Sequence, residues 1–261
     1  MKHQEFQLYV MRHDRASEVL AERLAPLAPI VINLNDYLRK YETYTKRKIR
    51  RSIRQAFEAQ DLRKTPLVVY GSGDYHHYTY GLCREVADKR SAGYSYIHID
   101  QHTDFGSPRE FRPKKSDLCC GDFVAQIVED TNAKSSTHIG QDFTWNLGSV
   151  ARGTKFTDYM FSMHLKDNQM WFRKIRDMLS WTKPEVYVTI DLDVLTPPFI
   201  RTDYENGDLT LPQLLQTIRK IKQRRKIVGL DICGLTDENE IDERSIQTHV
   251  EIINCVRGVR K

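Results

Sequence analysis

The sequence predicts an α/β protein in which helices cover both faces of a central, mainly parallel sheet, giving three layers. Short apolar and β-branched runs alternate with longer amphipathic runs along the chain, as they do in βαβ units. Several short runs end in segments rich in Asp, His or Gly, and ligand sites of such sheets lie at the carboxyl ends of the strands. The chain has 261 residues, 40% of them hydrophobic, and no evident linker, so we expect a single domain over residues 1–261.

The strands are expected at short runs of apolar and β-branched residues, which are typical of buried parallel strands. The runs before Asp100 and Asp191 are the clearest of them. The eight expected strands occupy residues 6–11, 29–34, 67–70, 94–99, 136–139, 155–160, 185–190 and 226–230.

The helices are expected where apolar residues recur every three or four positions. Leu211, Leu214 and Ile218 show this spacing, and Pro212 falls in the first turn of the helix that they indicate. The seven expected helices occupy residues 16–27, 37–60, 78–90, 122–130, 169–182, 211–225 and 243–256.

The composition favours a cytoplasmic protein that has no membrane partner. Five cysteines are an odd number without the spacing of a disulfide framework, so we expect reduced thiols. No apolar run is long enough to cross a bilayer, and the first residues lack the apolar stretch of a secretory signal.

The net charge of +5 comes largely from two basic segments, residues 46–54 and 219–226. Such segments can contact nucleic acid. Both, however, have helical apolar spacing, and neither carries interleaved aromatic residues or a nucleic-acid motif. We therefore interpret them as solvated helix faces and expect no nucleic-acid partner.

Carboxylates and imidazoles follow two of the expected strands directly. Asp100, His102 and Asp104 follow the first strand, and Asp191 and Asp193 follow the second. Acidic groups gathered where buried strands end repel one another and lose hydration, and a bound cation compensates for both effects. We therefore predict a metal site, with two metal ions.

A third expected strand runs into the segment Gly-Ser-Gly-Asp-Tyr-His-His at residues 71–77. Glycine allows a sharp turn there, and a histidine at the start of the following helix can direct its imidazole into the crevice. His98, inside the strand before Asp100, is expected to be a core residue or to support the site from behind.

These three segments resemble the motifs of the ureohydrolase family, which includes arginase and agmatinase and has the arginase/deacetylase α/β fold. The family motifs are Gly-Gly-Asp-His, Asp-x-His-x-Asp and Asp-x-Asp-x-x-Asp-Pro, each at the end of a strand of a central parallel sheet. The resemblance covers residues 65–255, whereas the preceding residues match only in general β/α character.

The resemblance implies that Asp100 and Asp191 bridge two metal ions. One ion would also bind Asp104 and His76, and the other would bind His102 and Asp193. His76 is chosen by aligning residues 76–80 with the helix that follows the first family motif. The loop holds one residue more than the family spacing, so His77 is the alternative ligand.

The implied ligand set consists of carboxylates and two imidazoles without thiolate, which suits Mn²⁺ better than zinc. We therefore expect two manganese ions per chain, although other divalent metals are possible. In the family, a hydroxide held between the ions attacks a guanidinium carbon and urea is released. Asp104 is expected to hold that hydroxide and to pass its proton to the leaving amine.

The chain departs from the family at three positions. Thr196 replaces the last acid of the third motif, which is not a metal ligand in the family, so the metal prediction is unchanged. Asp231 matches the start of the C-terminal family motif and is expected at the substrate, but Gly234 stands where the family has a guanidinium-binding glutamate. Cys120 replaces a proton-shuttling histidine, and either acts as nucleophile or acid or is a small buried residue. The alternative acceptors for a guanidinium are the loop residues Asp237, Glu238 and Glu240.

The resemblance and the departures leave three hypotheses for function. The first is a binuclear metal hydrolase of linear C–N bonds that acts on a guanidino or amidine substrate other than arginine. The second is a deacetylase-like hydrolase of the same fold that acts on an acylated amine. The third is a non-catalytic metal-binding homologue. The first two imply a small-molecule substrate, and the family often forms homo-oligomers.

Overall fold

A single parallel sheet runs through the computed structural model, which describes residues 4–34, 44–105, 116–141, 157–161, 167–236 and 241–259. Within these residues its strand order is β2-β1-β4-β10-β9-β5-β7-β8, and every neighbouring pair is parallel. The strands are β1 (Phe6–Arg12), β2 (Ile30–Asn33), β4 (Thr65–Val69), β5 (Tyr94–Ile99), β7 (Ala133–Gln141), β8 (Thr157–Phe161), β9 (Glu185–Asp191) and β10 (Lys226–Cys233). The predicted α/β fold with a parallel sheet is confirmed.

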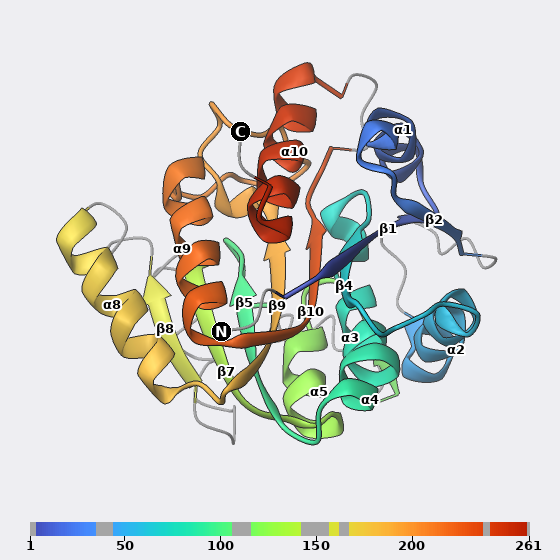
Figure 1. Ribbon diagram of the computed structural model, residues 1–261, viewed down its shortest axis with the longest axis horizontal. Helices are drawn as coiled ribbons and strands as arrows, with labels where there is room; N and C mark the ends of the chain where they lie inside the picture. The colour runs from blue at the N-terminus through green and yellow to red at the C-terminus, as the bar shows by residue number, and fades with distance from the viewer. Residues whose placement is uncertain are drawn as a thin grey trace.

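Helices cover both faces of this sheet (Figure 1). Because neighbouring strand residues point to opposite faces, the apolar side chains divide into two cores. One core lies under α1 (Arg15–Arg23), α8 (Asn168–Trp181), α9 (Leu211–Arg224) and α10 (Glu243–Arg257). The other lies under α2 (Lys46–Phe57), α3 (Tyr78–Leu82) and α5 (Phe123–Asp130). The three predicted layers are therefore present.

The helices begin and end at residues that satisfy free backbone groups. Asp14 and Ser17 form a reciprocal capping box at the start of α1, and Thr210 and Gln213 form another at the start of α9. The end of α10 is capped by Gly258 at a φ of 75°, a conformation that favours glycine. These local features explain why the helix positions follow from the sequence.

Three differences between the expected and observed elements go beyond shifts of a few residues at their ends. Residues 78–90 form α3, a π-helical turn η3 (Cys83–Ala87) and α4 (Asp88–Arg90) instead of one regular helix. Of the helix expected at 37–60, the described residues form α2 only over Lys46–Phe57. Before it, the two-residue strand β3 (Tyr44–Thr45) pairs antiparallel with β6 (Asp117–Leu118).

The basic residues of α2 are partly or fully exposed, and two of them, Arg50 and Arg54, bind the buried Glu85 of η3.

No helix within the described residues is long and apolar enough to cross a membrane. The cytoplasmic location, the single domain and the absence of a nucleic-acid partner stay predictions.

The strand order places four carboxyl ends side by side in the middle of the sheet. Strands β4 and β5 follow one another in the chain, apart from helices, yet β10 and β9 lie between them. Ligand crevices in open α/β sheets form where strand order reverses in this way. The motifs after β4, β5, β9 and β10 therefore meet at one place.

Candidate metal centre

Five acidic or imidazole side chains are buried at the carboxyl edge of the sheet. Asp100 follows β5 directly, Asp191 is the last residue of β9, and His76 follows the short 3-10 turn η2 (Gly73–Tyr75) after β4. Each of these three exposes 4% of its surface or less. Asp193 lies in η5 (Leu192–Val194), and Asp104 comes from the loop after β5. The structure thus brings together residues more than 100 positions apart.

His76 is surrounded by three carboxylates. Its Nδ1 atom lies 3.1 Å from Asp100 Oδ2, 3.2 Å from Asp104 Oδ2 and 3.4 Å from Asp191 Oδ2. Ligand atoms that share one ion at 2.0–2.2 Å lie about 3–3.5 Å from one another. This nitrogen is buried and forms no hydrogen bond. The four atoms therefore converge as ligands of one ion do.

The other ring nitrogen of His76 orients the imidazole. Nε2 lies 2.9 Å from the Thr189 hydroxyl, and that hydroxyl donates over 2.5 Å to Asp231 Oδ1. Because the hydroxyl proton is committed to the carboxylate, the Thr189 oxygen accepts the Nε2 proton of His76, and Nδ1 faces the three carboxylates. Burial lowers the pKa of His76, but the nearby Cys233, Asp100 and Asp104 raise it well above its ordinary value, so a metal ion at Nδ1 would displace a proton.

A second group of ligand atoms adjoins the first and shares Asp100 with it. Asp100, His102 and Asp193 each offer one atom within 4.8 Å of the other two. His102 Nδ1 lies 2.9 Å from Asp193 Oδ2 and 3.6 Å from Asp100 Oδ1. Asp100 thus directs one oxygen toward each group, as expected of a bridging carboxylate. The His102 side chain is 45% exposed, so this second position faces solvent.

The carboxylates are crowded enough to disturb their own ionisation. Burial, together with the charge of Asp100, raises the pKa of Asp104 to about 6. Burial and the charge of Asp191 raise the pKa of Asp193 well above its ordinary value. Asp104 also has a φ of 49°, a costly conformation for a residue other than glycine. Divalent cations would relieve this repulsion, so the residues present fit a metal centre.

His77, the alternative ligand, lies elsewhere. It is buried, and its ring stacks on Tyr44 with centroids 6.0 Å apart. Burial lowers its pKa to about 3. Within the described residues, the groups that could hold a metal include His76 and leave out His77.

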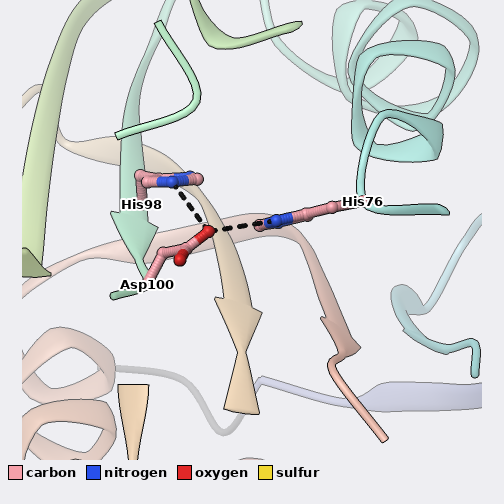
Figure 2. A group of neighbouring side chains, drawn as sticks. All are labelled: His76, His98 and Asp100. Atoms are coloured by element: carbon pink, nitrogen blue, oxygen red, sulfur yellow. Dashed lines mark ion pairs between the residues drawn. The ribbon is translucent and has the colours of Figure 1, made fainter. Parts of the chain in front are cut away.

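Two further side chains lie at the site, His98 and Cys233, and neither was expected from the sequence to be a metal ligand. Figure 2 shows the Asp100 carboxylate between His76 and His98, and Asp100 Oδ2 lies 3.1 Å from His98 Nε2. His98 Nε2 also lies 3.2 Å from the His102 carbonyl oxygen, which can only accept, so Nε2 carries a proton and donates toward this carbonyl and Asp100. In the neutral ring, Nδ1 then accepts from the Tyr96 hydroxyl over 3.1 Å. Cys233, at the end of β10, places its Sγ 3.4 Å from Asp191 Oδ2. Only its position after a buried strand could have indicated Cys233.

Asp231 does not face the crevice as the substrate contact expected from sequence would. It is fully buried, and its carboxylate accepts hydrogen bonds from four hydroxyl groups, those of Tyr70, Thr79, Tyr187 and Thr189. With both oxygens engaged, the side chain supports His76 through Thr189 and has no room for a substrate.

Gly234 has a φ of 98° and packs against the metal-binding segment. A Cβ atom at this position would overlap the Asp191 carboxylate and the backbone nitrogen of Leu192. The backbone of this chain therefore excludes a glutamate here. The alternative acceptors Asp237, Glu238 and Glu240 lie outside the described residues.

Cys120 lies in the turn before α5, near the mouth of the site. Its Sγ is 4.0 Å from the Tyr204 hydroxyl, which donates a hydrogen bond to Asp74. Burial, with the nearby charge of Asp104, raises the pKa of Cys120 to about 12. The thiol is therefore protonated at neutral pH, which disfavours the nucleophile role. Its role as an acid stays a prediction.

The comparisons with known proteins agree with this geometry. A family model described as the arginase family matches residues 15–257. Formimidoylglutamase from Bacillus subtilis superposes with a TM-score of 0.72 at 14% identity, over 98% of this chain and 88% of that one. Arginase from Medicago truncatula superposes with a TM-score of 0.67 at 16% identity. A hypothetical agmatinase from Burkholderia thailandensis superposes with a TM-score of 0.67 at 18% identity. Both superpositions cover 98% of this chain and 86% of the other chain. No curated protein matches the sequence.

Proposed function

Because the chain belongs to the arginase family, we propose that it is a metal-dependent hydrolase of linear C–N bonds. The substrate would be a guanidino or amidine compound other than arginine. The observation that carries this proposal is the pair of ligand groups that share the Asp100 carboxylate. Two adjacent cations are the arrangement that such hydrolases use to activate water.

The proposed metal ligands fall into two sets. His76, Asp100, Asp104 and Asp191 would hold one ion, while His102, Asp193 and the remaining oxygens of Asp100 and Asp191 would hold the other. Carboxylate-rich sets of this kind favour Mn²⁺, and we propose two manganese ions per chain. When bound, the ions supply a water molecule that loses its proton near neutral pH.

Asp104 is the proposed acid and base. Its carboxylate would accept the proton of the attacking water and then donate it to the leaving amine. The left-handed backbone at Asp104 directs the side chain toward His76, which lies 3.2 Å away.

The choice of substrate follows from Gly234. A guanidinium is a planar cation whose fixed donors require a charged acceptor. Gly234 offers none, and its backbone excludes a side chain. An amidinium is also a cation, but it has one nitrogen fewer than a guanidinium and therefore requires fewer acceptors. Formimidoyl compounds, of the kind named in one structural neighbour, meet this description.

The absence of a side chain at Gly234 also supports a second candidate, hydrolysis of an acylated amine. Such a substrate is neutral at the scissile bond and needs no carboxylate partner. A non-catalytic metal-binding protein is the remaining candidate, and it would keep the ligands without turnover.

A product screen on the manganese-loaded protein distinguishes these candidates. Guanidino substrates would release urea, formimidoyl substrates would release formamide, and acylated amines would release a carboxylic acid. The proposal requires urea or formamide, with loss of at least about 100-fold in rate in Asp104→Asn. Lys48→Ala on the outer side of α2 is the matched control and should keep the full rate. Release of only a carboxylic acid would support the second candidate, and no turnover on any substrate would support the third.

A further inference from the structure

We propose that Cys233 is a ligand of the ion at His76, and that this position therefore prefers thiophilic ions such as zinc and cobalt(II). The inference rests on the metal centre of the proposed function and refines one of its two positions. The position at His102 would keep its oxygen-rich character.

The sheet register places Cys233 beside the site. Strand β10 runs parallel to β9, and Cys233 pairs with Asp191 at the last step of the ladder. Cys233 Sγ and His76 Nδ1 each lie 3.4 Å from Asp191 Oδ2, and all three atoms lie within 4.8 Å of one another. With zinc–sulfur bonds of about 2.3 Å and bonds to nitrogen or oxygen of about 2.0–2.2 Å, ligands of one ion have such separations.

The state of His76 is the independent observation that points to an ion. Its Nδ1 atom is buried without a hydrogen bond, while the Thr189 hydroxyl holds Nε2 and so keeps Nδ1 directed at the site. An imidazole, a carboxylate and a thiol directed at one point form a ligand set that suits zinc.

Cys233 would make the two metal positions chemically different. Thiolate favours zinc and cobalt(II) over manganese more strongly than carboxylates do. As the sulfur–metal bond forms, the thiol loses its proton to solvent, and no electron is transferred. His98 does not compete for this position, because its Nε2 proton points to the His102 carbonyl, 3.2 Å away, and to Asp100.

Cobalt(II) titration of the full-length, metal-stripped protein tests the assignment. Bound thiolate gives cobalt a near-ultraviolet charge-transfer absorption that oxygen and nitrogen ligands do not give. We expect this absorption in the wild type and its loss in Cys233→Ser. We also expect zinc affinity to fall about 10-fold or more in that variant, with a smaller change for manganese. Cys255→Ser on α10 and Cys120→Ser near the mouth are matched controls and should keep the absorption.

Two results would overturn the inference: cobalt that binds without the absorption, or an absorption that survives in Cys233→Ser. If Cys233→Ser does not fold, zinc X-ray absorption of the wild type decides instead, because a sulfur ligand appears at about 2.3 Å. Failure of the inference differs from failure of the proposed function. In the first case two metal equivalents bind without sulfur and the substrate screen still releases urea or formamide. In the second case the screen releases neither product, whether or not the cobalt absorption is present.

Discussion

The Nε2 atom of His76 lies 2.9 Å from the hydroxyl of Thr189, and this contact orients the imidazole. Thr189 in turn donates to the buried carboxylate of Asp231. The Nδ1 atom of His76 is therefore directed at Asp100, Asp104 and Asp191. Thr189, which is not itself a proposed ligand, thus orients one of the proposed ligands.

Replacing Thr189 by Val removes this contact while nearly keeping the side-chain shape. His76 Nε2 then lacks its acceptor, and the imidazole is free to turn or to change its tautomer. We expect metal affinity to fall about 10- to 100-fold. Competition with a chelating dye measures this loss, and Thr189→Ser, which keeps the hydroxyl, is the control. Equal metal affinity in the Val variant and the wild type would show that the contact does not orient His76.

Metal affinity should depend on pH through Asp104. In the metal-free protein its pKa is raised to about 6, so below that pH the carboxylate carries a proton that a metal ion must displace. The contribution of Asp104 to the affinity should therefore be nearly constant above pH 7 and fall by up to about tenfold per pH unit below pH 6, in addition to the effect of the protons that His76 and His102 release. Dye competition between pH 5 and 8 measures the profile. A profile that stays flat down to pH 5 would contradict the raised pKa.

Gly234→Ala should damage the site without any loss of a ligand. The added Cβ overlaps the Asp191 carboxylate, and the φ of 98° strains any side chain. We expect a loss of about 1–3 kcal/mol in the free energy of unfolding together with weaker metal binding. Chemical denaturation and metal titration measure the two effects. Gly93→Ala is the control, since its Cβ would meet only the flexible side chain of Lys134. Similar behaviour of the two variants would mean that Gly234 has another backbone conformation.

The buried His249 on α10 should make the fold sensitive to acid. Burial lowers its pKa to about 4, and its Nδ1 lies 2.8 Å from the Ser245 carbonyl. An unfolded histidine binds a proton near pH 6.5 and the folded one does not, so stability is full above pH 6.5 and declines as pH falls toward 4. Between pH 7.5 and 5 the decline from this group is about 2 kcal/mol.

Urea denaturation of the wild type and His249→Leu at these two pH values tests whether His249 causes the decline in stability. The Leu variant cannot bind the proton, so its stability should change less between pH 7.5 and 5. If both proteins lose the same free energy of unfolding between pH 7.5 and 5, His249 does not cause the decline.

The fold could be predicted largely from local patterns, because each central strand is a continuous apolar run that ends at a polar segment. The Asp100 and Asp191 segments could be found for the same reason. Strands β3 and β6 could not be predicted, because each has only two residues and their pairing joins positions far apart in the sequence.

The parts of the site that could not be predicted from the sequence depend on which strands are neighbours in the sheet and on their register. Cys233 becomes a neighbour of Asp191 only because β10 lies next to β9, and Asp231 meets Thr189 for the same reason. Whether His76 or His77 points to the crevice depends on the turn η2. The loop holds one residue more than the family spacing, so the sequence alone leaves the choice between the two histidines open. The donor role of His98 depends on the His102 carbonyl, which the loop after β5 places beside its Nε2 atom.

The metal content of the purified protein tests the central proposal most directly. Elemental analysis should find about two divalent ions per chain in the wild type after manganese loading. It should find close to none in Asp100→Ala, because the shared carboxylate serves both positions, and an unchanged content in Cys120→Ser. A wild type that binds no divalent metal, or an Asp100→Ala protein that keeps both ions, would contradict the proposed centre.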